Sequence, residues 1–279
     1  MKLRKKIVGL GIAFLLGAFS MVGCSTGSGS GGDSSLAAIQ ERGEVRIAVF
    51  GDLIPYGYMD ENGNHQGYDV YLAKQIGKDL LGSEDKVKFV VLNAEERVDA
   101  LKSNKVDIVL ANFTKTAERE KVVDFAEPYM KVAIGVVSKK DNLITNVEQL
   151  DGQSLIVTKG TTSELYFTKN HPQVKLEKFD SKSQQFAALT DGRVNALADD
   201  NSYLYGWVKN NPDFAVGIKE LGEIETINPA VKKGNSTLLE WLNKEIKSLT
   251  QEKFFVKAYD ETLKSFFGEE IEAKDLIME

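Results

Sequence analysis

The fold of this chain is indicated by thirteen consecutive residues, Asp107-Ile-Val-Leu-Ala-Asn-Phe-Thr-Lys-Thr-Ala-Glu-Arg119. The apolar run from Ile108 to Ala111 predicts a strand that enters a core. Short polar side chains follow at Asn112 and Thr114, and Thr116 is placed to cap a helix in which Arg119 is the third residue. A helix N-terminus beside hydroxyl groups and a guanidinium is a site for a small carboxylate, although a capped helix with a surface arginine also satisfies the pattern.

Strand and helix patterns alternate on both sides of this stretch. Up to its end we predict strands at 44–50, 87–92 and 106–111, and helices at 69–82 and 95–103, the first of them capped by Asp69. After it we predict strands at 133–138, 154–158, 174–179 and 195–198, helices at 164–169 and 184–190, and a helical tail at 237–251 and 254–267. This order predicts an α/β fold of two lobes, with parallel-type sheets covered by helices.

The first 23 residues have the pattern of an export signal. Four of the first six residues are basic, and the apolar run at 7–19 is short for a membrane span. Met21-Val-Gly-Cys24 resembles the bacterial lipoprotein cleavage box, with Met where Leu is usual. Cys24 is the only cysteine of the chain, and lipid attachment at a new N-terminus gives this lone thiol a role. An ordinary secretion signal, cut after a small residue, is the alternative.

Residues 24–41 are expected to be the lipid-bearing cysteine and a flexible tether, because 25–35 are rich in Gly and Ser and lack an apolar anchor. Removal of residues 1–23 leaves 31 Lys and Arg against 41 Asp and Glu, a net charge of −10 instead of −6. This acidic balance argues against nucleic acid as a partner and restricts membrane contact to the lipid and the tether. About 245 residues remain, enough for one large or two small domains.

Several kinds of site are excluded by residue spacing. His65, in a polar loop, and His171, beside a proline, have no metal-ligand spacing between them and are predicted to be solvated. Residues 42–279 contain no Gly-x-Ser-x-Gly sequence for a serine nucleophile, and the match at Gly23-Cys-Ser-Thr-Gly27 lies at the cleavage box and the tether. Gly160-Thr-Thr-Ser163 follows a predicted strand but lacks the lysine and glycine spacing of a phosphate loop, which favours a neutral polar loop on a small ligand. We therefore predict no metal, no cofactor and no catalytic residue.

Three further groups keep more than one interpretation. Asp199 and Asp200 end a predicted strand, where they suit acid–base chemistry, a ligand ammonium group or the cap of a helix. Phe50 and Tyr56 flank the first strand-to-loop passage, either as core residues or as cover for the hydrocarbon part of a ligand. Arg97 lies among acidic residues of a short predicted helix, where it forms a surface salt bridge or contributes to a site.

Over residues 42–267 the chain resembles the solute-binding proteins of bacterial polar amino-acid ABC transporters. The shared motifs are Gly67-Tyr-Asp-Val70, Val106-Asp107, Thr114-Lys-Thr-Ala-Glu-Arg119, Val123-Asp-Phe-Ala-Glu-Pro-Tyr129, Gly160-Thr-Thr162 and Val194-Asn-Ala-Leu-Ala-Asp-Asp200. Asn195 stands where the family usually has Asp. A closer resemblance to the cysteine-binding branch comes from Val49-Phe-Gly-Asp52, Leu110-Ala-Asn-Phe-Thr114, Tyr129-Met-Lys-Val-Ala133 and Pro229-Ala-Val-Lys-Lys-Gly234.

The resemblance implies roles for particular residues. Arg119 is expected to bind the α-carboxylate of an amino acid, and Asp200 the α-ammonium group. Additional hydrogen bonds to these two groups are expected from nearby polar residues, namely the Thr116 backbone N–H, the turn at Thr161 and Thr162, the Thr114 hydroxyl and the Asn112 carbonyl.

The side-chain pocket is expected to contain Arg97, Phe50 and Tyr56. Arg97 matches the position that reads a side-chain carboxylate in acidic-amino-acid binders of the family. Those binders also have a lysine near the position of Phe50, so the pocket here is less polar and suits a thiol or thioether-sized group.

The resemblance also implies a type II periplasmic-binding-protein fold with two crossing hinge strands. Lobe one is expected at 42–131 and 228–279, and lobe two at 132–227. The expected protein is a monomeric, non-catalytic lipoprotein on the extracytoplasmic side of the membrane, which closes on a polar amino acid, best cysteine, and delivers it to an ABC permease. The alternatives are a binder of glutamate, aspartate, glutamine or cystine, and less favourably a dehydratase-type enzyme or an adhesin on this scaffold.

Overall fold

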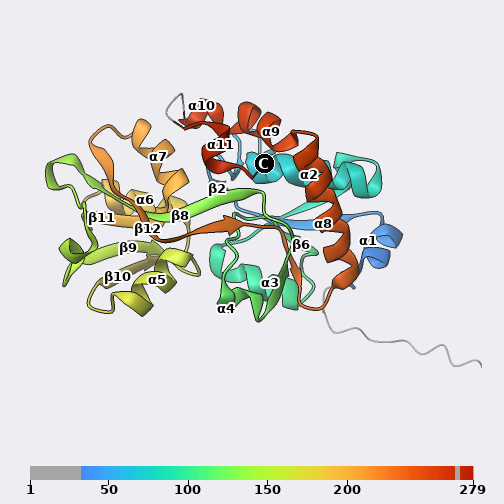
Figure 1. Ribbon diagram of the computed structural model, residues 1–279, viewed down its shortest axis with the longest axis horizontal. Coiled ribbons are helices and arrows are strands. Elements are labelled where there is room, and N and C mark those ends of the chain that lie inside the picture. The colour runs from blue at the N-terminus through green and yellow to red at the C-terminus, as the bar shows by residue number, and fades with distance from the viewer. Residues whose placement is uncertain (1–32, 268–270, 279) are drawn as a thin grey trace, which may run out of the picture.

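Two α/β lobes lie side by side in the computed structural model, which describes residues 33–267 and 271–278 (Figure 1). Lobe one is built on a five-stranded sheet in the order β5-β1-β6-β13-β7. Its strands are β1 (Val45–Val49), β5 (Val87–Val91), β6 (Ile108–Val109), β7 (Val123–Phe125) and β13 (Ala230–Lys232). Strand β1 pairs in parallel with β5 and β6, whereas β13 runs antiparallel to β6 and β7.

The helices of lobe one pack on both faces of this sheet. They are α1 (Leu36–Arg42), α2 (Tyr68–Leu81), α3 (Arg97–Lys102), α4 (Ala117–Glu120), α8 (Ser236–Gln251) and α9 (Phe254–Thr262), with 3₁₀ turns at Glu84–Lys86 and Ala94–Glu96. A small sheet of β2 (Asp52–Leu53), β3 (Gly57–Met59) and β4 (His65–Gln66) follows β1. Helix α2 is capped by Gly67, so the prediction that Asp69 caps it was wrong, because the Asp69 side chain turns into the core instead.

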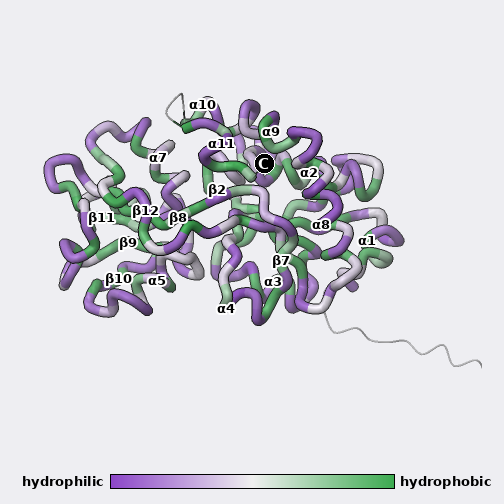
Figure 2. The backbone as a smooth tube through the Cα atoms, viewed as in Figure 1, coloured by the Kyte–Doolittle hydropathy of each residue, from purple (hydrophilic) through white to green (hydrophobic). Residues whose placement is uncertain are grey.

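Lobe two has a second five-stranded sheet, in the order β10-β9-β11-β8-β12. Its elements are β8 (Met130–Lys139), β9 (Ser154–Thr158), β10 (Lys175–Phe179), β11 (Ala196–Asp200) and β12 (Phe214–Ile227), with helices α5 (Thr162–Asn170), α6 (Lys182–Thr190) and α7 (Asn201–Lys209) and 3₁₀ turns at Lys140–Asn142 and Val147–Leu150. Strand β9 pairs in parallel with β10 and β11, and β8 is antiparallel to β11 and β12. Figure 2 shows apolar residues along the central strands, where the cores lie.

Two long strands connect the lobes. Strand β8 leaves lobe one, and β12 returns beside it, antiparallel from Lys139↔Phe214 to Met130↔Ile227 with register shifts between them. At its end β12 also bridges to Thr114 of lobe one. The predicted two-lobe α/β fold with two crossing strands is therefore confirmed. The exact lobe boundaries near 131 and 228 stay a prediction, because the first falls within β8 and the second at the end of β12.

The C-terminal tail contacts both lobes, although we expected it to belong to lobe one alone. Helix α10 (Lys264–Phe267) packs on α7 of lobe two, where the Phe266 ring stacks 6.3 Å from that of Tyr203. Helix α11 (Ala273–Leu276) lies against β8, and Ile277 bridges to Met130. The tail thus crosses the junction beside the connecting strands (Figure 1).

Asp107, the first residue of the 107–119 stretch, is fully buried and links α1 and β1 through hydrogen bonds. Its carboxylate accepts hydrogen bonds from the guanidinium groups of Arg42 and Arg46, each at 2.6 Å, and from the Arg46 backbone N–H at 2.7 Å. A carboxylate without solvent requires such charged donors.

We predict that Asp107→Ala lowers the free energy of unfolding by about 3–5 kcal/mol, because it leaves two partly buried guanidinium groups without their carboxylate. Equilibrium urea denaturation measures this loss. The matched control, Asp141→Ala, removes an exposed carboxylate and is expected to change stability by less than about 0.5 kcal/mol. A loss below about 1 kcal/mol for Asp107→Ala would contradict the role assigned to this buried carboxylate.

Candidate ligand-binding site

A small, nearly closed cavity lies where the two lobes meet. It is lined from both sides by predicted site residues and by one residue that we did not predict: Phe50, Arg97, Asn112, Thr114, Arg119, Thr161, Thr162, Asp200 and the additional Lys182. The structure thus brings eight of the ten predicted residues together, and only Thr116 and Tyr56 are not among the lining residues.

Asn112 reaches the cavity because a buried carboxylate holds its backbone. Asn112 has a φ of 43°, in the left-handed region, and its N–H donates to Asp69 at 2.8 Å. The hydroxyl of Tyr129 donates to the other oxygen of Asp69 at 2.7 Å. Burial raises the pKa of Asp69 to about 7. Asp69 therefore fixes the turn at the end of β6, and the Asn112 amide crosses the cleft to donate to Asp200 at 2.7 Å.

Arg119 takes the position predicted for it. The Thr116 hydroxyl accepts from the Arg119 N–H at 3.2 Å, which confirms Thr116 as the N-cap of α4 and explains why its side chain does not line the cavity. The Arg119 guanidinium donates to the carbonyl oxygens of Thr114 at 2.6 Å and Gly160 at 2.9 Å. Burial lowers the pKa of Arg119 to about 10, so the group stays cationic at neutral pH.

Arg97 is buried, which excludes a surface salt bridge. Its guanidinium donates to the carbonyl oxygens of Ala94 at 2.8 Å, Ala111 at 2.9 Å and Gly160 at 3.0 Å. It also lies 4.4 Å from the ring centre of Phe113. Burial and the neighbouring Arg119 lower the pKa of Arg97, whereas Asp200 and Asp69 raise it.

Asp200 is the last residue of β11 and is buried opposite these two cations. It precedes α7 directly, but its side chain makes no capping hydrogen bond, which excludes the helix-cap interpretation. Burial and the neighbouring Asp199 together raise the pKa of Asp200 to about 7. The positive charges of Lys182, Arg119 and Arg97 act in the opposite direction.

Asp199 is occupied by another partner. Both of its carboxylate oxygens lie 2.7 Å from Nζ of Lys182, and the Gln185 amide donates to one of them. A carboxylate held in this way is a poor general acid or base. We missed Lys182 because a lysine at the start of a helix is usually solvated, although a second carboxylate in a buried strand was a signal that a cation must be near.

Tyr56 lies beside the cavity and does not line it. Its ring is fully buried, and its hydroxyl donates to the Ser202 hydroxyl of lobe two at 2.8 Å. Burial raises the pKa of the Tyr56 hydroxyl, so this group remains a donor. The structure thus gives Tyr56 a contact between the lobes, and its contact with a ligand stays a prediction.

The two lobes are in direct contact at Gly160. Its carbonyl accepts from both buried arginines, its φ is 75°, and a Cβ at this position would lie 2.6 Å from the Cα atom of Glu95 in lobe one. At the rim, the Asp52 carboxylate accepts from the Ser183 N–H at 3.0 Å and from its hydroxyl at 3.1 Å. These contacts define a closed arrangement of the two lobes.

The two histidines are not solvated as predicted, because each packs on an aromatic ring. His65 is half-buried with its ring 4.7 Å from that of Phe89, and burial lowers its pKa. His171 packs between Tyr166 and Phe167, each 5.6 Å away. Within residues 33–267 and 271–278, no group of three or more His, Cys, Asp or Glu residues is placed to hold a metal ion, and no helix is long and apolar enough to cross a membrane.

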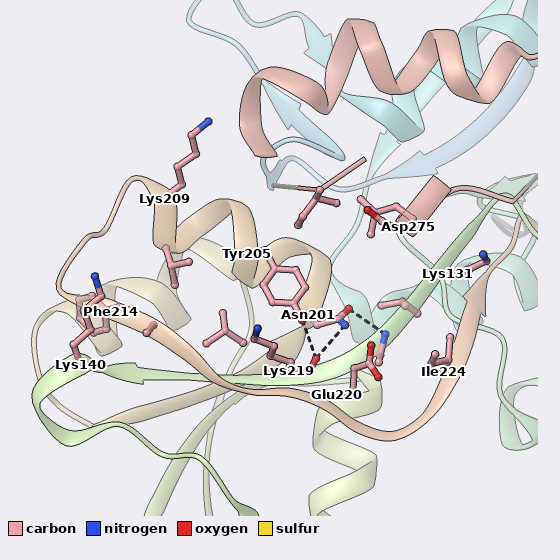
Figure 3. A pocket seen from close by; sticks show the side chains of 17 residues that line it. Lys131, Lys140, Asn201, Tyr205, Lys209, Phe214, Lys219, Glu220, Ile224 and Asp275 are labelled. Carbon is pink, nitrogen blue, oxygen red and sulfur yellow. Dashed lines mark hydrogen bonds between the residues drawn. The ribbon is translucent and has the colours of Figure 1, made fainter. Parts of the chain in front are cut away.

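A larger hollow, of about 610 Å³, lies outside the closed cleft, between β8, β12, α7 and the C-terminal tail (Figure 3). Its charged side chains are exposed, among them Lys131, Lys140, Lys209 and Lys219. Buried charges of opposite sign face each other only in the smaller cavity among the described residues, and we therefore assign the site there.

Comparisons with known proteins bear on the class of protein to which the chain belongs. Residues 45–269 match the bacterial extracellular solute-binding proteins, family 3. A solved solute receptor for L-cysteine from Neisseria gonorrhoeae is 53% identical with a TM-score of 0.86, covering 88% of this chain and 100% of that one. A cysteine-binding protein from Campylobacter jejuni is 55% identical, also with a TM-score of 0.86, covering 88% of this chain and 98% of that one. The ABC transporter glutamine-binding protein of Bacillus subtilis is 31% identical, covering 95% of this chain and 98% of that protein.

Fold and site together define a two-lobed binding protein whose cleft closes on a small solute. The chain belongs to family 3 of the bacterial extracellular solute-binding proteins.

If the lobes close at Gly160, solute affinity depends on the absence of a side chain at this position. Gly160→Ala is expected to weaken solute affinity by more than about tenfold, because the added methyl group meets the lobe-one backbone at Glu95. Isothermal titration with L-cysteine and L-glutamine, the solutes named for relatives, measures this loss.

Gly152→Ala is the matched control for this substitution. Gly152 has a similar φ of 71° but nothing within 4 Å, so the control carries the backbone strain without the contact between the lobes. Equal affinities in the two variants would contradict the closing role of Gly160.

Proposed function

We propose that this protein captures a free amino acid, best L-cysteine, in its closed cleft and delivers it to an ABC importer. The observation that carries the proposal is the pair of buried, opposite charges from different lobes, Arg119 and Asp200. A zwitterion pairs with both of them and so favours the closed state. A ligand that lacks either charge leaves a buried ion unpaired, which costs several kcal/mol.

In this proposal Arg119 binds the α-carboxylate, with the Thr116 backbone N–H and the turn at Thr161 and Thr162. Asp200 binds the α-ammonium group together with Thr114. The amide of Asn112 supports this role, because its Nδ2 donates to Asp200 while its buried Oδ1 has no partner among the described residues. An ammonium group has three donors and requires such a second acceptor.

The same cavity favours a small side chain without positive charge. Arg97, Arg119 and Lys182 are three buried cations against Asp199 and Asp200, and a further cation would be repelled. Phe50 adds an apolar wall, and the cavity is small. Cysteine fits these conditions, and the two solved relatives named for cysteine are each more than 50% identical. Glutamine, glutamate, aspartate and cystine are the alternatives.

We further propose that the protein is a lipoprotein, attached through Cys24 on the extracytoplasmic side of the membrane. The cleavage-box pattern that ends at Cys24 supports this, and its residues lie outside those that the structure describes. A dehydratase-type reaction is disfavoured, because Asp199, the spare carboxylate of the cleft, is paired with Lys182. The protein is proposed to bind as a monomer and to present its closed form to a permease.

A thermal-shift screen with the twenty amino acids and cystine tests the proposed ligand. L-cysteine is expected to raise the melting temperature most, because a ligand that binds only the folded form stabilises it. Arg119→Ala and Asp200→Ala are each expected to weaken this ligand by more than about tenfold, since each strands an opposite buried charge. Asp141→Ala, far from any predicted site residue in sequence, is the control. Near-native affinity in either site variant would refute the pocket assignment.

The charge of the pocket makes a second, independent prediction about cationic amino acids. L-arginine and L-lysine at 1 mM are expected to leave the melting temperature unchanged. Their affinity is expected to be roughly a hundred times lower than that of L-cysteine, because three buried cations already line the cavity. Titration calorimetry at low and high salt checks this. Micromolar binding of arginine would show that the cavity charges do not select the side chain.

A further inference from the structure

A buried ion pair, Lys182 with Asp199, lies next to Asp200. Lys182 is the first residue of α6, and its side chain is 4% exposed, as is that of Asp199. Its Nζ lies 2.7 Å from both Asp199 oxygens. The Gln185 amide donates to the same carboxylate, and Thr158 donates to Gln185 at 2.6 Å.

This pair is costly for the fold. A cation at the first position of a helix opposes the helix dipole, and two buried charges lose their hydration. Apolar residues of similar size would often be as stable or more stable at such a place. The pair is therefore better explained by its effect on a neighbour than by stability.

The neighbour is Asp200. Asp199 precedes it in β11 and accepts its backbone N–H at 2.8 Å, so a second buried carboxylate lies one residue from that of Asp200. Two neighbouring negative charges hinder ionisation of one of the two groups. Nζ of Lys182 supplies the compensating charge from the adjacent helix.

Other groups also face Asp200. From lobe one come the guanidinium groups of Arg97 and Arg119, the amide of Asn112 and, further away, the neutral hydroxyl of Tyr56. The two arginines belong to the opposite lobe, so their contribution depends on closure. Lys182 is the cation that shares a lobe with Asp200, and it acts before the lobes meet.

We infer that Lys182 is a positioning residue for ligand capture: paired with Asp199, it keeps Asp200 ionised so that a ligand ammonium group can bind. This inference rests on the proposed function for its role in binding. The effect on Asp200 itself is a property of the ligand-free protein and can be measured alone.

The electrostatics of the site agree with this inference. The pKa of Asp200, raised to about 7 mainly by burial and then by Asp199, is opposed most strongly by Lys182. Loss of the Lys182 ammonium group therefore raises the pKa of Asp200, and loss of the negative charge of Asp199 lowers it. An ionised Asp200 is present above its pKa and is lost as the pH falls through it, so binding weakens toward acid pH.

The test is a ¹³C NMR titration of the Asp200 carboxyl carbon in the ligand-free full chain, assigned with Asp200→Asn. Lys182→Met is expected to raise the Asp200 pKa by about one unit or more, and Asp199→Asn to lower it. The double variant removes both charges and is expected to lie near the wild type. Lys182→Arg keeps the positive charge and is expected to shift the pKa back toward the wild-type value.

Calorimetry with L-cysteine at pH 6, 7 and 8 gives the second readout. In Lys182→Met the affinity is expected to fall about tenfold at pH 7, with the pH profile displaced toward alkaline pH. A purely structural role would lower affinity by the same factor at each pH and would leave the profile in place.

Equal Asp200 pKa values in the wild type, Lys182→Met and Asp199→Asn would overturn the inference. If Lys182→Met does not fold, Asp199→Asn and the double variant decide it by the same order of pKa values. The proposed function fails separately: a wild type that binds no amino acid refutes it, whatever the order of the pKa values.

Discussion

Two buried charges of opposite sign, Arg119 in lobe one and Asp200 in lobe two, are the constraint on which this structure depends. Each is expensive to remove from water, and neither is neutralised by a direct ion pair among the described residues. In the proposed function the protein carries this cost in the region where the lobes meet, because a zwitterion satisfies both groups at once. Selectivity for amino acids and closure of the cleft then have the same physical cause.

Polar side chains reach the cleft because strands of both lobes end there. The turn after β6 presents Asn112, and β11 ends in Asp200, so the two side chains meet across the junction. Buried polar groups behind them fix their geometry, with Asp69 holding the backbone of Asn112 and Lys182 pairing with Asp199. Gly160 permits the final approach, since its carbonyl reaches both arginines where a side chain would meet lobe one.

Much of this was predictable because the signals are local. The alternation of strand and helix patterns predicted the two lobes, and the Thr116 cap was read from its distance to Arg119 along the chain. Residues whose roles depend on distant partners were not predictable in this way. Lys182 resembles a solvated helix residue until Asp199 is placed beside it, and Asp69 resembles a cap until Tyr129 and Asn112 approach. The hydrogen bond from Tyr56 to Ser202 was also not predictable, because the two residues lie 146 positions apart.

The most direct test of the central claim compares one amino acid with its two truncated analogues. Calorimetric titration with L-cysteine, cysteamine and 3-mercaptopropionate presents both charges, only the ammonium group and only the carboxylate, while the thiol is kept. The clamp between Arg119 and Asp200 predicts that L-cysteine binds and that each analogue is weaker by more than about a hundredfold, because each leaves one buried charge unpaired. Binding of either analogue within tenfold of L-cysteine would contradict the claim that the two lobes close on a zwitterion.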